Sequence, residues 1–275
     1  MKNKVYKTQT TNNQQPVTIL VTGASGQLGK TIEELYSKNE ANLEFTFVSK
    51  ENLDITNEGE LLLYFKANKF DYCINCAAYT NVEQAEKTPE IAYNVNAEGV
   101  KYLAKVCKET QTILIHISTD YVFDGEKSEP YLVSDIPNPI NEYGKSKLLG
   151  ESYIQSVIKK HFIIRTSWLY SKKYGQNFYK SILAKAKVEK ELFITDEQIG
   201  CPTNTVNLAR FLYQIIINKN NKFGIYHFCD GKAMTWYDFA EQILSENNLL
   251  ANTNLVKINN YRTFAKRPKN SVLKI

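Results

Sequence analysis

The sequence of 275 residues predicts an α/β fold: a Rossmann-type, doubly wound parallel sheet with a smaller C-terminal lobe. Two observations support this prediction. Short apolar strand patterns alternate with helix patterns through the first two-thirds of the chain, as in parallel sheets whose connections are helical. The first strand pattern also runs through a glycine-rich turn into a helix, which is how such sheets begin.

The stretch 17–29 reads as strand, tight turn and helix, with glycines at three-residue spacing. Gly23 allows a sharp turn, Gly26 allows the backbone to approach a diphosphate, and Gly29 allows the helix to pack closely. Gln27 and Leu28 begin the helix, whose free N–H groups attract phosphates. We therefore expect a nucleotide cofactor here rather than a purely structural turn.

The other elements follow in order. Strands are predicted at 17–22, 44–49, 72–76, 112–118 and 162–165, and helices at 27–38, 57–68, 89–110 and 143–159. Beyond Arg165 the pattern is less regular, with helix patterns near 204–217 and 235–245 and a strand-like stretch at 224–229. We predict a disordered tail at 1–16, a cofactor-binding lobe at 17–167 and a mainly substrate-binding lobe at 168–275, packed against the first.

Composition excludes several function classes. The net charge of +5 is spread along the chain, which argues against a nucleic-acid partner. No apolar run approaches the ~18 residues that span a bilayer, so no membrane partner is expected. Five cysteines without a disulfide-scaffold spacing indicate a reducing, cytoplasmic setting. Cys73 and Cys76 match C-x-x-C, but they lie in a strand pattern that points them to opposite faces. The three histidines have no second ligand at metal spacing, so core or surface roles are expected for them and no metal ligand is assigned.

Polar side chains with catalytic potential occur in two places. Tyr143 and Lys147 share one helical face. A lysine ammonium beside a phenol lowers the pKa of the tyrosine, which favours proton exchange. Upstream, an apolar strand ends in Ser118 and Thr119, either of which could bond a carbonyl oxygen. Spacing alone would also fit surface residues, but with a nicotinamide cofactor on the glycine turn these groups predict carbonyl reduction.

Five motifs in this order, TGASGQLG, NCAAYTNVEQAE, STDYVFDG, YGKSK and RTSWLY, resemble the extended short-chain dehydrogenase/reductases. With DEQIGCPT and RPKNSVL, the chain more narrowly resembles the dTDP-4-dehydrorhamnose reductase family over about residues 17 to 273. The resemblance implies NAD(P)H-dependent reduction of the C4 keto group of dTDP-4-dehydro-L-rhamnose to dTDP-L-rhamnose, for surface polysaccharide.

The resemblance also implies roles for residues. Tyr143 would donate the proton, Lys147 would hold the nicotinamide ribose, and Thr119 would orient the C4 carbonyl. The remaining site residues would be Ala78, Tyr79 and Thr80 along the cofactor, Asp54 and Ile55 near its adenine, and Ser118, Asp120, Trp168 and Arg267 toward the dTDP-sugar, with Arg267 on its diphosphate. The alternatives are a core position for Trp168, a loop cap for Asp120 and a solvated charge for Arg267.

The chain departs from the family pattern in two places. Ser49 and Lys50 follow the second strand, where an acidic residue would bind a ribose 2′-OH, so we predict that NADPH is preferred and NADH is usable. Family members usually continue beyond the position of Ile275 into a helical segment, which we expect to be absent or replaced. Some relatives use a metal, so Mg²⁺ remains a candidate ligand to which no residues are assigned. The sequence is also compatible with a homodimer.

Two alternatives stay open. One is another nucleotide-sugar reductase, epimerase or dehydratase of the same superfamily, although Tyr121 stands where dehydratases carry a glutamate. Another is a non-catalytic, NADP-binding regulatory subunit. The presence of Thr119, Tyr143 and Lys147 favours catalysis.

Overall fold

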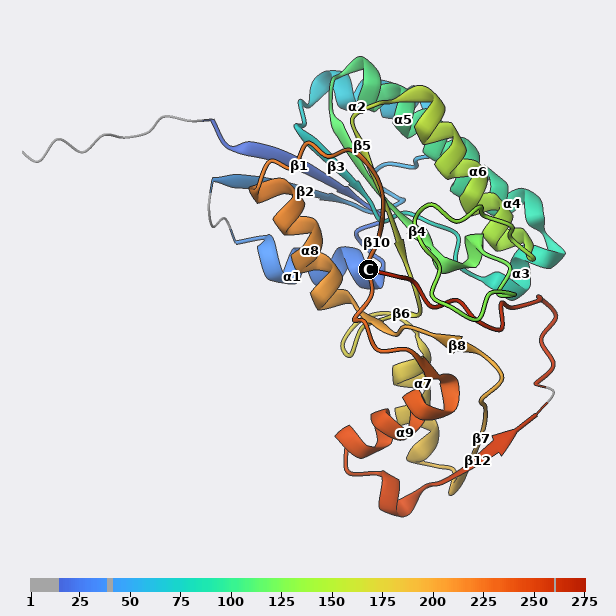
Figure 1. Ribbon diagram of the computed structural model, residues 1–275. Helices are drawn as coiled ribbons and strands as arrows, with labels where there is room; N and C mark the ends of the chain where they lie inside the picture. The colour runs from blue at the N-terminus through green and yellow to red at the C-terminus, as the bar shows by residue number, and fades with distance from the viewer. Residues whose placement is uncertain (1–14, 39–41, 260) are drawn as a thin grey trace, which may run out of the picture.

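The computed structural model describes residues 15–38, 42–259 and 261–275. Its first lobe is a six-stranded parallel sheet with the strand order β10-β5-β4-β3-β1-β2 (Figure 1). These strands are β1 (Val17–Thr22), β2 (Leu43–Val48), β3 (Tyr72–Asn75), β4 (Ile113–Thr119), β5 (His161–Thr166) and β10 (Gly224–His227). The predicted parallel sheet is confirmed, whereas the predicted tail lies almost entirely outside the described residues.

Helices cover both faces of this sheet. One face carries α2 (Glu58–Ala67), α5 (Gly99–Glu109) and α6 (Glu142–Val157), and the other carries α1 (Gln27–Tyr36) and α8 (Thr205–Ile217) (Figure 1). Leu103 of α5 and Leu212 of α8 are buried in the two opposite cores. Since both faces are buried, the strands read in the sequence as nearly continuous apolar runs.

The single helix predicted at 89–110 is interrupted. After a short α3 (Val82–Lys87), α4 (Pro89–Tyr93) passes through one π-helical turn, Asn94–Glu98, into α5. The side chain of Asn96 in this turn accepts from the N–H of Tyr79 and donates to its carbonyl, both at 2.9 Å, and also donates to Ser146 Oγ at 3.0 Å. The π turn thus fixes the loop that follows β3 against α6.

The second lobe packs two helices, α7 (Phe178–Ala186) and α9 (Trp236–Glu246), with a parallel strand pair, β7 (Glu191–Thr195) and β12 (Asn254–Ile258). Short strands connect it to the first lobe: β6 (Leu169–Tyr170), β8 (Ile199–Gly200), β9 (Thr203–Asn204) and β11 (Met234–Thr235). Neither α7 nor the β7–β12 pair was predicted from the sequence.

The range 168–275 belongs to both lobes. After β9, the chain returns to the first lobe as α8 and then as β10, which forms the sheet edge beside β5. It then crosses again into α9 and β12, and the segment 261–275 runs back along the first lobe, where Leu273 pairs with Tyr131. Both lobes therefore contribute to any site between them.

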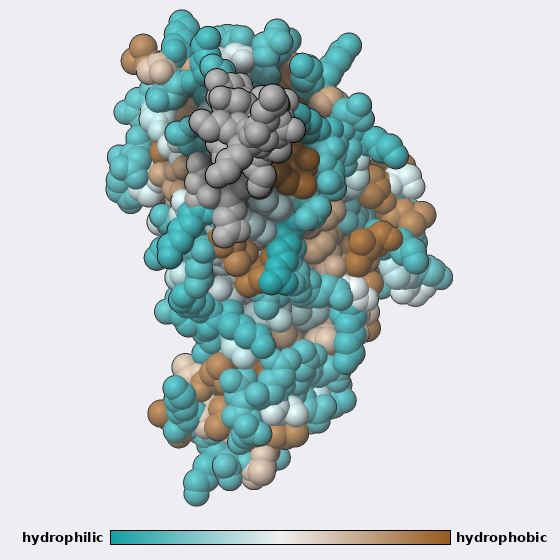
Figure 2. All heavy atoms as spheres, turned by 90° about the vertical axis from the view of Figure 1, so that its left-hand side faces the viewer, coloured by the Kyte–Doolittle hydropathy of each residue, from teal (hydrophilic) through white to brown (hydrophobic). Residues whose placement is uncertain are grey.

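The surface of the molecule is mostly polar in the view of Figure 2. Hydrophobic side chains form separate small patches there rather than one continuous area. None of the helices within the described residues is long and apolar enough to cross a membrane.

Candidate active site

A cavity of about 420 Å³ opens at the carboxyl ends of the strands, between the two lobes. Of the residues singled out in the sequence, it is lined by Gly26, Gln27, Leu28, Gly29, Ala78, Thr80, Ser118, Thr119, Asp120, Tyr143, Lys147, Trp168 and Arg267. Gly23, Ser49, Lys50, Asp54, Ile55 and Tyr79 are not among its lining residues.

The glycine turn has the shape that a diphosphate requires. Gly23 has φ +66°, and a Cβ there would lie 2.5 Å from the nitrogen of Ala77. A Cβ at Gly29 would lie 2.6 Å from the Cα of Ala24, so the helix packs closely against the turn. Gly26 is the N-cap residue of α1 and, as a glycine, makes no side-chain capping hydrogen bond. It also lines the cavity. The first N–H groups of α1 are thus available to phosphate oxygens.

Gln27 joins this turn to the second lobe. Its Nε2 donates to the carbonyl of Leu169 at 3.0 Å, and its Oε1 accepts from Asn177 Nδ2 at 3.1 Å. The side chain that begins α1 therefore helps to hold the two walls of the cavity together.

Tyr143 faces the cavity as a protonated phenol. Burial raises its pKa well above the ordinary value, and Asp120 and Tyr121 raise it further, while a hydrogen bond with Thr119 acts in the opposite direction. The expectation that Lys147 lowers this pKa is wrong, because the effect of burial dominates. A phenol that keeps its proton suits a proton donor. Thr119 Oγ1 also donates to Asp120 Oδ1 at 3.1 Å.

Lys147 is 2% exposed, and its Nζ meets two groups of β4. Its Nζ donates to the carbonyl of Ile117 at 2.7 Å and lies 3.2 Å from His116 Nε2. Burial lowers the pKa of Lys147 to about 8. The sequence offers no reason to connect His116 with Lys147, because the two residues are distant in the chain.

Ser118 and Asp120 are both engaged with protein groups. Ser118 Oγ donates to Glu151 Oε1 at 2.5 Å, and Glu151 forms a buried ion pair with Arg165 at 2.7 Å. Asp120 Oδ2 accepts from Ser167 Oγ at 2.8 Å, and burial raises the pKa of Asp120 to about 6. Both strand-end hydroxyls thus donate to a carboxylate, Ser118 to Glu151 and Thr119 to Asp120, and Thr119 is the one that also bonds Tyr143.

Trp168 forms part of the cavity wall with residues of the second lobe. It has φ +46°, in the left-handed region that bulky side chains seldom adopt. Its ring stacks on Trp236 with centroids 3.5 Å apart and planes 5° apart. A Cβ at Gly200 would lie 2.4 Å from the Trp168 ring, which explains the glycine in DEQIGCPT. Trp168 is thus both packed and at the cavity.

Arg267 is held at the cavity rather than solvated. Its Nη2 pairs with Glu83 Oε1 at 2.7 Å, and its Nη1 donates to the hydroxyl of Tyr121 at 3.1 Å. Glu83 also accepts from the backbone N–H groups of Phe264 and Ala265, so one carboxylate of α3 holds the C-terminal segment.

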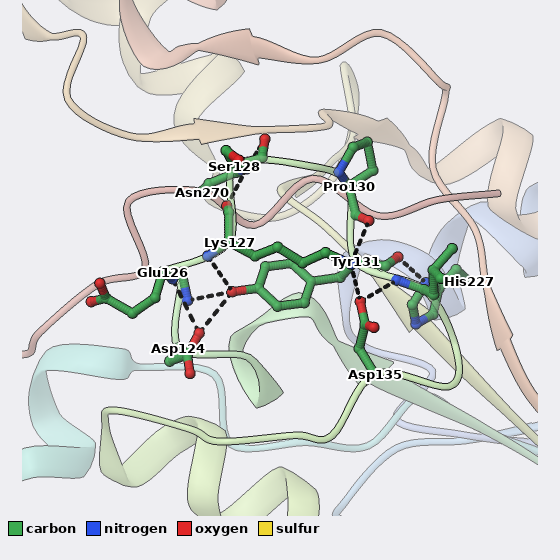
Figure 3. A network of polar contacts seen from close by, with 11 residues as sticks. Asp124, Glu126, Lys127, Ser128, Pro130, Tyr131, Asp135, His227 and Asn270 are labelled. Atoms are coloured by element: carbon green, nitrogen blue, oxygen red, sulfur yellow. Dashed lines mark hydrogen bonds and ion pairs between the residues drawn. The ribbon is translucent and has the colours of Figure 1, made fainter.

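A second network anchors the same segment further along (Figure 3). Tyr131 donates its hydroxyl to Asp124 Oδ1 at 2.7 Å, and its backbone N–H bonds the carbonyl of Val272 at 2.8 Å. Asn270 donates to the carbonyls of Lys127 and Ser128. The position of Arg267 is therefore fixed from both sides.

The end of β2 differs from the expectation in one respect. Ser49 Oγ donates to Glu51 Oε2 at 2.6 Å, so an acidic residue missed in the sequence lies beside the proposed phosphate donor. Lys50 is exposed and lies 3.7 Å from Asp54, which caps the N–H of Thr56. Ile55 is buried in the core beside Gly99 rather than open to a ligand.

Several lining residues escaped sequence reasoning: Cys76, Val82, Ile117, Tyr121, Thr166, Leu169, Tyr170, Gln176, Asn177, Phe178, Trp236 and Phe239. Tyr121 lies within STDYVFDG, where the motif itself was a usable signal. The aromatic residues of α7 and α9 belong to no motif and reach the cavity only through tertiary folding. Within the described part of the chain, no group of three or more His, Cys, Asp or Glu residues could hold a metal ion.

Comparisons with known proteins agree over nearly the whole chain. A family model described as the RmlD substrate binding domain matches residues 17–275. A dTDP-4-dehydrorhamnose reductase of Aggregatibacter actinomycetemcomitans is 41% identical over 265 residues, covering 93% of this chain and 90% of that protein. The Escherichia coli (strain K12) protein of the same name is 36% identical, covering 93% and 88%. A crystal structure of dTDP-4-dehydrorhamnose reductase from Bacillus anthracis str. Ames in complex with NADP is 36% identical, covers 94% and 90%, and has a TM-score of 0.90.

Proposed function

The chain belongs to the RmlD substrate binding domain family, and from this premise we infer that it is an NADPH-dependent oxidoreductase. It reduces the C4 keto group of dTDP-4-dehydro-L-rhamnose to dTDP-L-rhamnose. The observation that supports this most strongly is the meeting of Tyr143, Thr119 and Lys147 with the glycine turn in one cavity.

We propose these roles for the catalytic residues. Thr119 turns its hydroxyl from Asp120 Oδ1 and donates a hydrogen bond to the C4 carbonyl oxygen. Tyr143 gives its phenolic proton to that oxygen as it becomes a hydroxyl. When bound, the nicotinamide cofactor supplies the hydride that reaches C4. Lys147 holds the nicotinamide ribose with Nζ. The raised pKa of Tyr143 keeps its proton available at neutral pH.

The substrate would lie between Trp168 and the C-terminal segment. Trp168 offers a ring face to the sugar, and Asp120 and Ser118 support that wall through Ser167 and Glu151. Arg267 lines the cavity with a guanidinium that can bind the diphosphate.

Arg267→Ala should raise KM for the sugar nucleotide far more than KM for the cofactor, and equal effects on both would contradict this role.

The cofactor site would extend from the glycine turn past Ala78, Tyr79 and Thr80, with the adenine near Asp54 and near the backbone of Ile55, whose side chain is buried. NADPH would be preferred, with Ser49 and Lys50 at the 2′-phosphate and NADH still usable. Support comes from the exposed ammonium of Lys50 at the end of β2. Glu51 reduces this preference, because its carboxylate repels a phosphate.

Two further proposals concern the setting. We place the enzyme in the cytoplasm, where its five cysteines stay reduced, as all are in the structure. A homodimer is a separate proposal, for which sedimentation equilibrium at several protein concentrations is the test.

One assay tests the function. The purified protein is mixed with NADPH, with and without dTDP-4-dehydro-L-rhamnose (dTDP-4-keto-6-deoxy-L-mannose). The oxidation of NADPH is followed as the loss of nicotinamide absorbance. We expect oxidation only with the sugar nucleotide, and dTDP-L-rhamnose as product. Cofactor binding without turnover would indicate a regulatory subunit, and sugar conversion without net NADPH oxidation would indicate an epimerase or dehydratase.

A further inference from the structure

The side chain of Gln27 connects the glycine turn to two points of the second lobe. Its Nε2 donates to the carbonyl of Leu169 at 3.0 Å, and its Oε1 accepts from Asn177 Nδ2 at 3.1 Å. Leu169 follows Trp168 in the chain, and Asn177 precedes Phe178. Gln27 is therefore bonded directly beside two aromatic residues that line the cavity.

These two aromatic residues pack on one ring of α9. Trp236 stacks on Trp168 with centroids 3.5 Å apart, and the centroid of Phe178 lies 4.5 Å from that of Trp236. All three rings line the cavity and are half-buried. We call Trp168, Phe178 and Trp236 the aromatic wall. A shift of the backbone at either Trp168 or Phe178 would change the shape of this wall.

Backbone groups fix the orientation of both amide side chains. The carbonyl of Leu169 can only accept, so Gln27 turns its NH₂ group toward Leu169 and its oxygen toward Asn177. Asn177 is the N-cap residue of α7, and its oxygen accepts from the N–H of Lys180 at 3.1 Å. Its NH₂ group therefore faces Gln27 and also donates to the carbonyl of Ser171 at 2.9 Å. Turning either amide over would bring like groups together.

The loop that joins these two points, 171–177, lies along α1. Its residue Gly175 has φ +67°, and a Cβ there would lie 3.0 Å from Gln27 Cβ, so the loop packs directly on the Gln27 side chain. Lys173 of the same loop pairs with Glu34, about two helical turns beyond Gln27. The contact between the glycine turn and the second lobe is therefore built from several groups.

Trp168 depends on such contacts because its own backbone is strained. Its φ of +46° lies in the left-handed region, which a bulky residue keeps only when the surrounding structure holds it there. The bond from Gln27 to the carbonyl of Leu169 acts on the peptide next to this strained residue. It comes from the first residue of α1, where the N–H groups for a diphosphate begin.

We propose that Gln27 is a positioning residue for the sugar nucleotide: through Leu169 and Asn177, its side chain sets the aromatic wall against which the sugar lies. The presence of the sugar at this wall rests on the proposed function. The rival role for this side chain is a contact with the cofactor alone. In that case its loss would weaken cofactor binding and leave the binding of the sugar nucleotide unchanged.

Gln27→Met separates these two roles by binding alone. Methionine has a similar length and keeps the backbone N–H groups of α1, but it makes neither side-chain hydrogen bond. Isothermal titration gives Kd for NADP⁺, dTDP and dTDP-L-rhamnose. We expect Kd for dTDP-L-rhamnose to rise about tenfold or more, because two positioning hydrogen bonds are lost, and Kd for dTDP, which lacks the sugar, to rise less.

Kd for NADP⁺ should change by less than about twofold, because backbone N–H groups meet its diphosphate. The urea midpoint of the variant, measured alongside, shows whether it is folded. An unchanged Kd for dTDP-L-rhamnose in the folded variant would overturn the proposal. So would a Kd for NADP⁺ that rises as much as that for dTDP-L-rhamnose.

A second test displaces Gln27 without replacing it. In Gly175→Ala the new Cβ presses on Gln27 Cβ from a left-handed backbone. Gly231→Ala is the matched control, since Gly231 has φ +83° and its Cβ would meet only Ile275 Cδ1 at 3.6 Å. Both variants carry backbone strain, so we expect similar losses in urea midpoint. Only Gly175→Ala should bind dTDP-L-rhamnose more weakly, and equal Kd values in the two variants would contradict the proposal.

The binding measurements also distinguish this inference from the proposed function. A wild-type protein that binds no dTDP-L-rhamnose would overturn the proposed function and this inference with it. A wild-type protein that binds dTDP-L-rhamnose no more tightly than Gln27→Met and Gly175→Ala do would overturn this inference alone.

Discussion

Single residues decide the chemistry of this site, and Tyr143 is the sharpest case. Tyr143→Phe keeps the ring, whose centroid lies 5.9 Å from that of Tyr121, but removes the proposed proton donor. Loss of a general acid typically costs about 10²- to 10⁴-fold in rate, so we expect kcat to fall by that amount. Stopped-flow or steady-state NADPH oxidation measures it, and unchanged NADPH affinity is the control. A variant with near-wild-type kcat would exclude Tyr143 as the donor.

We propose that cofactor choice depends on two adjacent side chains of opposite charge, Lys50 and Glu51. Lys50→Ala removes the ammonium proposed to attract the 2′-phosphate, and Glu51→Gln removes the carboxylate that opposes it. Because Lys50 is exposed, we expect only about 1 kcal/mol, so the NADPH-to-NADH ratio of kcat/KM should fall roughly fivefold in Lys50→Ala. Glu51→Gln should raise that ratio. If both variants keep the wild-type ratio, β2 does not set the preference.

The sequence could reveal those site residues whose meaning is local. Tyr143 and Lys147 are four residues apart and so share a helical face. The spacing of the glycines indicates a nucleotide-binding turn. The direction of the Tyr143 pKa could not be predicted, because it depends on burial by residues distant in the chain. The same holds for Trp236, which reaches Trp168 only after the second lobe has folded.

At the scale of elements, the contact between the π turn and α6 allows no side chain at Gly150. A Cβ there would lie 2.2 Å from the carbonyl oxygen of Asn96, a backbone atom that cannot easily move. Overpacking of this kind costs about 1–3 kcal/mol, so we expect Gly150→Ala to unfold at lower urea concentration.

Gly59→Ala is the matched control, since its Cβ would meet only Asn57 Oδ1 at 3.5 Å in another helix. Alanine favours the helix over glycine by up to about 1 kcal/mol, so this variant should equal or exceed wild type in stability. Equal urea midpoints for Gly150→Ala and wild type would show that the two helices can separate at low cost.

Helices and strands were predicted correctly where the hydrophobic periodicity of the sequence was strong. The first five strands were found within a few residues, and so were α1, α2 and α6, whereas α3 was missed and the helix predicted at 89–110 is interrupted. The helix α7 was not predicted, because lysines and tyrosines obscure its apolar positions. The strand-like stretch at 224–229 was predicted and forms β10. Its pairing with β5 was not predicted. Pairing between strands some 60 residues apart leaves no local trace in the sequence.

At the scale of the whole molecule, stability should depend on pH through buried histidines. Burial lowers the pKa of His116, His161 and His227, the last to about 4. As pH falls from about 6.5 toward 4, the unfolded chain binds protons that the folded protein does not, so folding becomes less favourable. Asp120, whose pKa is raised to about 6, opposes this trend with a single group.

We therefore expect the urea midpoint to be lower at pH 5 than at pH 7.5. His227→Gln should reduce the difference, because each histidine contributes at most about 1.4 kcal/mol per pH unit. A midpoint that stays constant or rises on acidification would contradict the expectation.

The return of the chain to the first lobe imposes an order on biosynthesis. During translation, β1 to β5 leave the ribosome first, but the strand that completes their edge, β10, and the helix that carries Leu212 into the core, α8, follow only after β6 to β9 have been made. Until then β5 presents an unpaired edge, which is open to pairing with another chain. The edge of β5 is thus covered only by a later part of the same chain. A ribosome that pauses between residues 168 and 204 would lengthen the period in which a chaperone must cover this edge instead.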